Sequence, residues 1–149
     1  MPLVEFDHFS LAGAPRLFTT REANALLPEL EPVIVRMRTA AQARLAASET
    51  VQAFARRLEA SGGGRPDASE AEAQRELGAA VEQLRESLET LARLGVQVKD
   101  PLRGLIDFPS ERDGELVELC WLHGEPVVSH WHRLGEGFAG RRPLVEEDA

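Results

Sequence analysis

Two apolar stripes separated by a glycine-rich break constrain the fold of this chain more than any other feature of its sequence. Both advance in steps of three and four residues, the spacing of one face of an α-helix. Residues 61–66 hold three glycines and a proline, which end a helix and form a loop. The sequence therefore predicts two long helices packed as an antiparallel hairpin. The first stripe is Leu30, Ile34, Met37, Ala41, Leu45, Ser48, Val51, Ala55 and Leu58, and the second is Leu77, Val81, Leu84, Leu88 and Leu91.

Capping residues set the expected ends of the helices. Thr19 and Glu22 form a capping-box pattern, so the first helix is expected to begin at about residue 20. Asp67 and Ser69 are alternative caps for the second helix. Gly95 is its expected end, because glycine adopts the left-handed conformation at low cost.

Pro28 and Pro32 fall early in the first helix. Each removes a backbone donor and clashes with the preceding turn. The sequence therefore predicts a short helix over residues 20–27, then a kink or restart near Pro28, then a long helix.

Beyond Gly95 the hydrophobic period changes from about 3.6 to 2 residues, which indicates β-strands. Asp113 and Gly114 are a strong hairpin signal, and a second turn is expected at residues 123–125. The expected result is a small antiparallel β-meander. Its strands are predicted at residues 96–98, 104–109, 115–122 and 126–132.

The predicted fold class is α+β, a long antiparallel helical hairpin followed by a small antiparallel β-meander. The 149 residues are enough for one domain with its own core. Within a single domain of residues 1–149, the expected parts are a lead-in (1–18), the helical hairpin (19–95), the β-meander with a closing loop (96–143) and an acidic tail (144–149).

Composition and charge exclude several classes of partner. A formal net charge of −8 opposes binding to nucleic acid or to an anionic membrane, because a phosphate surface needs a basic footprint. One cysteine cannot form an internal disulfide, which favours a cytoplasmic location. The sequence has neither a secretory leader at its start nor an apolar run of the roughly 20 residues of a membrane span.

The last hairpin allows a prediction of which side chains share a face of the sheet. With a two-residue turn, His130 and His132 share a face with Trp121. Cys120 and Trp131 then lie on the opposite face, so the two tryptophans face opposite ways. A three-residue turn would reverse the assignment.

His130 and His132, two residues apart on one strand, project the same way and are a plausible start of a site for a divalent metal such as zinc. The alternative is a pair of partly buried histidines hydrogen-bonded to backbone or carboxylate groups. A third ligand is expected from a neighbouring turn or strand, and the candidates are Asp107, Glu125, Glu136 and His123.

Two other residues allow a chemical and a structural interpretation. Asp107 lies in an apolar strand and needs a partner if buried, either an arginine or His132. The pair would be an acid–base couple or a structural contact. Cys120 is interpreted as a small buried hydrophobic residue rather than a nucleophile.

Four residues are candidates for ligand or partner binding. Trp121 and Trp131 stand out in a chain with 5% aromatic residues, and an exposed tryptophan favours a binding surface, whereas burial of both indicates core packing. Glu125, in the turn, and Arg141, after a glycine-rich loop, complete the set.

Seven segments of the chain, taken in their order and spacing, carry a resemblance, and they begin at Phe18, Gly95, Gly104, Leu119, Gly124, Trp131 and Glu136. Together they resemble the domain of unknown function 2203 family of small bacterial and archaeal proteins. The resemblance covers nearly the whole chain and implies a helical hairpin followed by a small β region, but no reaction.

Two functional hypotheses follow. The first is a non-enzymatic homodimeric scaffold or binding protein that associates through its helices. In a hairpin of two helices each apolar stripe can be covered only by the other, so either the C-terminal sheet or a second copy of the chain must cover the rest, and a second copy is favoured. The second is a small metal-binding protein or metal-dependent hydrolase. Its centre would be His130, His132 and a carboxylate from Asp107 or Glu136.

Overall fold

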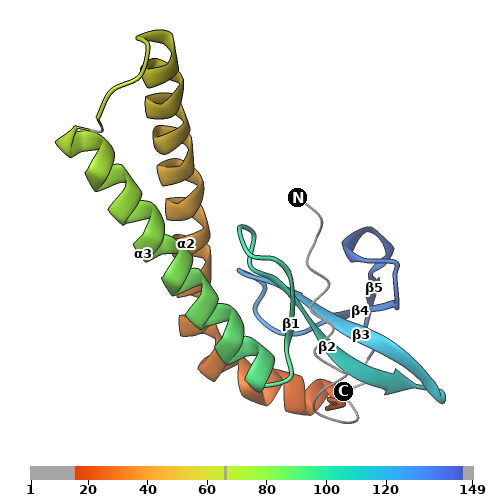
Figure 1. The fold of residues 1–149 in the computed structure, drawn as a ribbon. Helices are drawn as coiled ribbons and strands as arrows, with labels where there is room; N and C mark the ends of the chain where they lie inside the picture. Colours follow the sequence, from red (N-terminus) through yellow and green to blue (C-terminus); the bar gives the residue numbers. More distant parts are fainter. Residues whose placement is uncertain (1–15, 66, 146–149) are drawn as a thin grey trace.

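The computed structural model describes residues 16–65 and 67–145, so the predictions for residues 1–15 and 146–149 lie outside the described residues. The fold is α+β, as predicted, with a helical hairpin followed by an antiparallel sheet of strand order β1-β2-β3-β4-β5 (Figure 1). The elements are α2 (Thr20–Ala60), α3 (Ala68–Arg93), β1 (Gln97–Asp100), β2 (Leu105–Arg112), β3 (Glu115–Leu122), β4 (His130–Arg133), the short 3-10 helix η1 (Phe138–Gly140) and β5 (Arg142–Pro143).

Local hydrogen bonds fix the ends of the helices where the sequence predicts them. The Thr19 hydroxyl accepts a hydrogen bond from the Glu22 backbone N–H at 3.1 Å, and the Glu22 carboxylate accepts one from the Thr19 N–H at 3.0 Å. Asp67 caps α3 by accepting from Glu70 N–H at 2.9 Å. Gly95, with φ of 84°, follows the end of α3.

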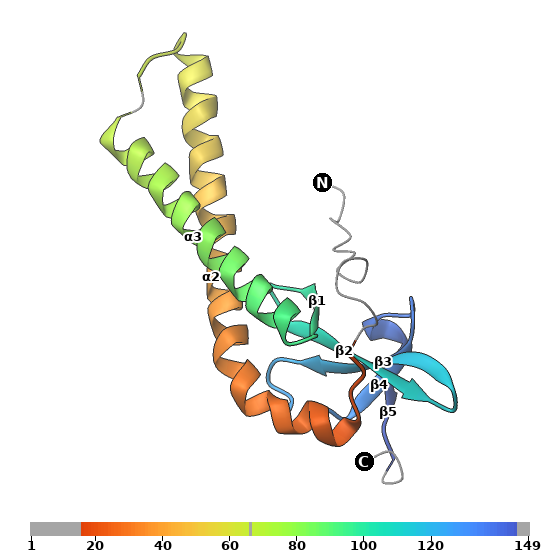
Figure 2. The same cartoon turned by 60° about the horizontal axis from the view of Figure 1, so that its bottom comes forward.

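The predicted separate helix over residues 20–27 is wrong, because α2 is one continuous helix that contains both Pro28 and Pro32. The predicted alternative of a kink agrees with Figure 2, in which the first turns of α2 run at an angle to the rest of the helix. Leu27, Leu30 and Ile34 around the prolines are at most 4% exposed. Their burial in the core stabilises helix where proline alone would disfavour it.

One face of the sheet packs against the base of the hairpin. Ile106 and Phe108 of β2 and Trp121 of β3 join the core cluster with Leu30 and Leu91 of the helices. The hairpin extends past the sheet toward the loop between α2 and α3 (Figure 1). Neither helix combines the length and apolar character that a membrane span requires.

The connection between β3 and β4 differs from the predicted short turn. It spans residues 123–129, and the register pairs Glu118 with His132 and Cys120 with His130. Asn24 of α2 holds this connection by accepting from the Val128 N–H at 2.7 Å.

The longer connection overturns the predicted face assignment. Residues paired directly across two strands share a face, so His130 and His132 lie on the side of Cys120, not on that of Trp121. Trp131 pairs with Leu119 and lies on the same face as Trp121. The two tryptophans therefore do not face opposite ways.

Candidate metal centre

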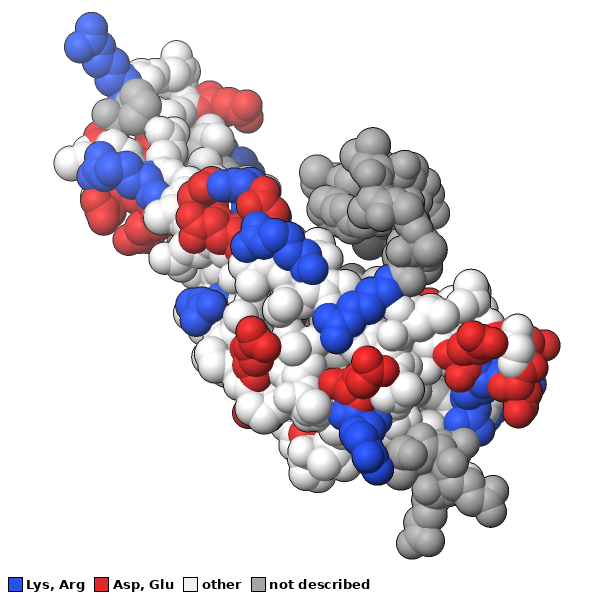
Figure 3. All heavy atoms as spheres, turned by 90° about the horizontal axis from the view of Figure 1, so that it is seen from below, with Lys and Arg blue, Asp and Glu red and all other residues white. Residues whose placement is uncertain are grey.

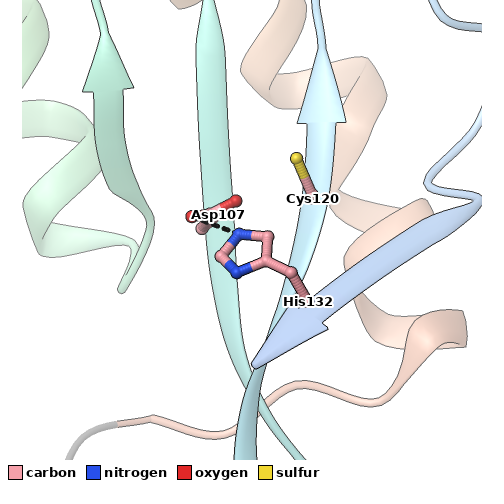
Figure 4. A group of neighbouring side chains, drawn as sticks. All are labelled: Asp107, Cys120 and His132. Carbon is pink, nitrogen blue, oxygen red and sulfur yellow. Dashed lines mark hydrogen bonds and ion pairs between the residues drawn. The ribbon is translucent and has the colours of Figure 1, made fainter. Parts of the chain in front are cut away.

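Asp107, Cys120 and His132 come together on the face of the sheet that does not pack against the hairpin. They are supplied by β2, β3 and β4, three neighbouring strands (Figure 4). Their donor atoms all lie within 4.8 Å of one another. The three residues are 1%, 1% and 2% exposed. We refer to these three residues as the trio.

The His132 ring is held through both of its nitrogens. Nδ1 lies 2.8 Å from the Arg133 carbonyl oxygen. Because a carbonyl oxygen only accepts, Nδ1 carries a hydrogen and donates it. Nε2 lies 3.0 Å from Asp107 Oδ2. A single proton therefore lies between Nε2 and the carboxyl group, on one side or the other.

Asp107 is a buried carboxyl group with incomplete hydrogen bonding. Its Oδ1 atom accepts no hydrogen bond from the residues that the structure describes. Burial, followed by the hydrogen bond and charge of the nearby Glu118 carboxylate, raises the pKa of Asp107 to about 8. Beside the Glu118 carboxylate, the site therefore disfavours a negative charge on Asp107 unless a cation accompanies it.

Glu118 and Lys99 border the trio. Lys99 Nζ lies 3.3 Å from Glu118 Oε2 and 3.9 Å from Asp107 Oδ2. Glu118 Oε2 in turn lies 3.9 Å from His132 Nε2. Burial alone would raise the pKa of Glu118, but the hydrogen bond with Asp107 and the Lys99 ammonium lower it. Glu118 is thus the ionised member of the carboxyl pair.

Cys120 lacks the environment of a catalytic thiol. Burial and the charge of Asp107 raise its pKa to about 12. Both nitrogens of His132 are engaged elsewhere, so the imidazole cannot accept the thiol proton. A metal cation reverses this preference, because a coordinated thiol loses its proton.

The structure separates the four predicted metal ligands. Asp107 and His132 lie in the trio, whereas His130 and Glu136 do not. His130 Nδ1 lies 2.9 Å from the Ser129 hydroxyl. Glu136 accepts from the Arg133 N–H at 3.3 Å in the turn after β4.

Cys120, Glu118 and Lys99 were not among the predicted site residues. The predicted two-residue turn placed Cys120 on the face opposite the histidines. Glu118 and Cys120 are two residues apart on β3, as His130 and His132 are on β4, so each pair projects from one face of its strand. A connection with an odd number of residues places both pairs on the same face, so the sequence could have identified the site had the length of the connection been known.

Three of the predicted binding residues form contacts around Glu125 in the β3–β4 connection, and the fourth, Trp131, contacts two arginines. Trp121 is 1% exposed and donates to the Glu125 carbonyl at 3.0 Å. Arg141 Nη2 lies 2.8 Å from both carboxylate oxygens of Glu125. The guanidinium groups of Arg112 and Arg142 lie 4.3 and 5.1 Å from the Trp131 ring centre. These contacts give all four residues a structural role.

Comparison with known proteins supplies a family but no activity. A family model described as "Uncharacterized conserved protein (DUF2203)" matches residues 16–144, which include every residue of the trio. No curated protein and no solved structure matches the chain. The chain belongs to the DUF2203 family of uncharacterized conserved proteins.

Proposed function

We propose that this protein binds a divalent transition-metal ion through Cys120 Sγ, His132 Nε2 and the Asp107 carboxylate. One observation carries the proposal: three donor atoms from neighbouring strands lie within 4.8 Å of one another in the interior. The Nδ1–H of His132, bound to a backbone carbonyl, orients Nε2 as histidine ligands are commonly oriented. Oδ1 of Asp107 adds a buried acceptor to which no described residue donates a hydrogen bond.

The donor set indicates which metals fit. Thiolate and imidazole ligands favour Zn²⁺ and Co²⁺, whereas Mg²⁺ and Ca²⁺ prefer sites built from oxygen atoms. A reduced thiol also fits the cytoplasmic location expected for a chain with one cysteine.

The burial of the trio favours a structural metal over a hydrolytic one. A catalytic zinc keeps a coordination position open to water and substrate, whereas structural sites are closed. The three ligands are at most 2% exposed. We therefore propose that the metal joins β2, β3 and β4, and we do not propose the hydrolase.

Metal content of the protein purified without a histidine tag tests the proposal. We expect roughly one zinc ion per chain, and Co²⁺ substitution is expected to give a thiolate-to-cobalt absorption band. Cys120→Ser and His132→Ala should lose the ion and the band. His130→Ala is the matched control, because His130 lies on the same strand outside the trio, and it should keep both. Unmodified protein that takes up neither Zn²⁺ nor Co²⁺ contradicts the proposal.

A homodimeric scaffold is a second candidate function, supported by the outer part of the hairpin. There the buried apolar residues of α2 and α3 are alanines, and Glu70 of α3 is also buried, while Leu45 and Val81 are 47% and 45% exposed. Side chains of both charge signs lie along the hairpin on the face shown in Figure 3. We propose that a second copy covers the exposed apolar residues.

Light scattering tests the dimer. We expect a dimeric mass for the unmodified protein and a monomeric mass after Leu45→Lys combined with Val81→Lys. Val127→Lys is the control, because Val127 is equally exposed, at 48%, but belongs to the β3–β4 connection. A monomeric mass for the unmodified protein contradicts the dimer and leaves the metal centre unaffected.

A further inference from the structure

From the contacts around the trio, we infer that Glu118 is a fourth metal ligand and that Lys99 is a built-in counter-cation that the metal displaces from it. The inference rests on the proposed metal centre, and it adds two residues that determine how tightly the ion is held.

Glu118 is placed to complete the coordination of an ion in the trio. It is the direct cross-strand partner of His132, as Cys120 is of Asp107, so the four side chains form two adjacent pairs on one face. Glu118 is 6% exposed, and its Oε2 lies 3.9 Å from His132 Nε2.

Closure of the site requires a fourth protein ligand. Structural zinc is almost always bound by four protein donors in tetrahedral geometry. The trio supplies three, and its burial excludes bulk water from the remaining position. Glu118 Oε2 is a buried atom whose ion-pair partner is the Lys99 ammonium at 3.3 Å, and Lys99 can move away. It therefore has a lone pair to give to a metal.

Lys99 neutralises the same carboxyl groups that would bind the metal. Its ammonium reaches Glu118 at 3.3 Å and Asp107 at 3.9 Å from the edge strand β1. The Lys99 side chain is 41% exposed, in contrast to the four donors. A lysine stem is flexible and its ammonium is readily hydrated, so Lys99 can withdraw into solvent when a metal enters.

Competition between two cations predicts the effect of Lys99 on affinity. Removing the ammonium removes both the repulsion of an incoming divalent ion and the ion pair that must break. Lys99→Met is therefore expected to tighten Zn²⁺ and Co²⁺ binding about tenfold or more. Lys99→Arg keeps the charge and is expected to change affinity by about twofold at most.

The expected effect of Glu118→Gln is opposite in sign. The amide keeps the shape of the side chain but is a much poorer metal ligand than a carboxylate, so affinity should fall about tenfold or more. Glu111→Gln, an exposed residue on β2, is the matched control and should leave affinity unchanged.

Competition titrations of Zn²⁺ and Co²⁺ against a chelator of known affinity measure these changes, with circular dichroism to verify folding. Tighter binding by Lys99→Met, with Lys99→Arg unchanged, supports the inference. Equal or weaker binding by Lys99→Met overturns the role of Lys99, and unchanged affinity of Glu118→Gln overturns the fourth ligand. Should Glu118→Gln not fold, Glu118→Asp serves in its place, because its shorter carboxylate must also weaken binding. If the unmodified protein binds neither ion, the metal centre itself is wrong.

Discussion

Asp107 makes the stability of the folded protein sensitive to pH. Its carboxyl pKa is about 8 in the folded protein against an ordinary value of 3.8. The folded protein therefore holds a proton that the unfolded chain releases between these values. The stability this proton contributes is present in full below about pH 4 and is lost as the pH rises through about 8. Glu118 affects stability in a different pH range. Its pKa is lowered from 4.5, so the stability that its ionised carboxylate contributes is lost only in acid, as the pH falls below that value.

With a chelator present, Asp107→Asn is expected to remove this pH dependence. The free energy of unfolding of the unmodified protein should fall by a few kcal/mol between about pH 5 and about pH 9, and that of Asp107→Asn should stay level. Urea unfolding at the two pH values measures both. Asp113→Asn, an exposed turn residue, is the control and should keep the slope. An equal slope in Asp107→Asn would contradict the assignment.

Gly104 allows the turn before β2 to lie close to α2 and to the β3–β4 connection. A Cβ atom there would lie 2.8 Å from His123 Cβ and 2.9 Å from Arg38 Cδ, and φ is 71°. Gly104→Ala is therefore expected to destabilise the protein by about 1–3 kcal/mol in urea unfolding. Gly78→Ala on α3 has open space and helical backbone, and should instead stabilise by about 0.5–1 kcal/mol. If Gly104→Ala leaves the free energy of unfolding unchanged, the neighbouring side chains can move aside without cost and the prediction is wrong.

Among the secondary-structure elements, the helix ends were predictable because their signals are local. Thr19 with Glu22, and Asp67 with Glu70, cap helices through groups three residues apart. The β3–β4 connection was not predictable in the same way. Asn24, 104 positions before Val128, helps to set its path, and no local pattern reports such a contact. The register, and with it the set of residues that form the trio, depended on that connection.

Asn24→Ala is expected to loosen the β3–β4 connection. The Asn24 side chain accepts from the Val128 N–H at 2.7 Å and donates to the Val128 carbonyl at 3.4 Å. Its removal leaves a largely buried backbone amide without its partner, at a cost of about 1–2 kcal/mol. Faster hydrogen exchange of the Val128 amide, with lower stability in urea, would confirm it. Asn24→Asp keeps the oxygen that accepts from the Val128 N–H, so it should lose less stability than Asn24→Ala.

For the whole molecule, one apolar cluster joins the hairpin to the sheet, while the proposed metal centre lies on the other face of the same strands. Ile106 and Phe108 reach the helices, and Asp107 between them reaches the centre. Because these residues alternate along one strand, the position of β2 affects both the apolar core on one face and the trio on the other. A metal that stabilises the strands should therefore also stabilise the helices packed on them.

Thermal unfolding followed by the far-ultraviolet helix signal tests this coupling. Zinc at about 100 times its dissociation constant should add about 2.7 kcal/mol, which raises the Tm by several degrees relative to protein in chelator. Most of the described helix lies in α2 and α3, away from the metal ligands, so a shift in this signal means that the two parts unfold together. Cys120→Ser should show no shift, whereas His130→Ala should retain it. Helices that melt at the same temperature with and without zinc, in protein that demonstrably binds it, would mean that the hairpin unfolds independently of the sheet.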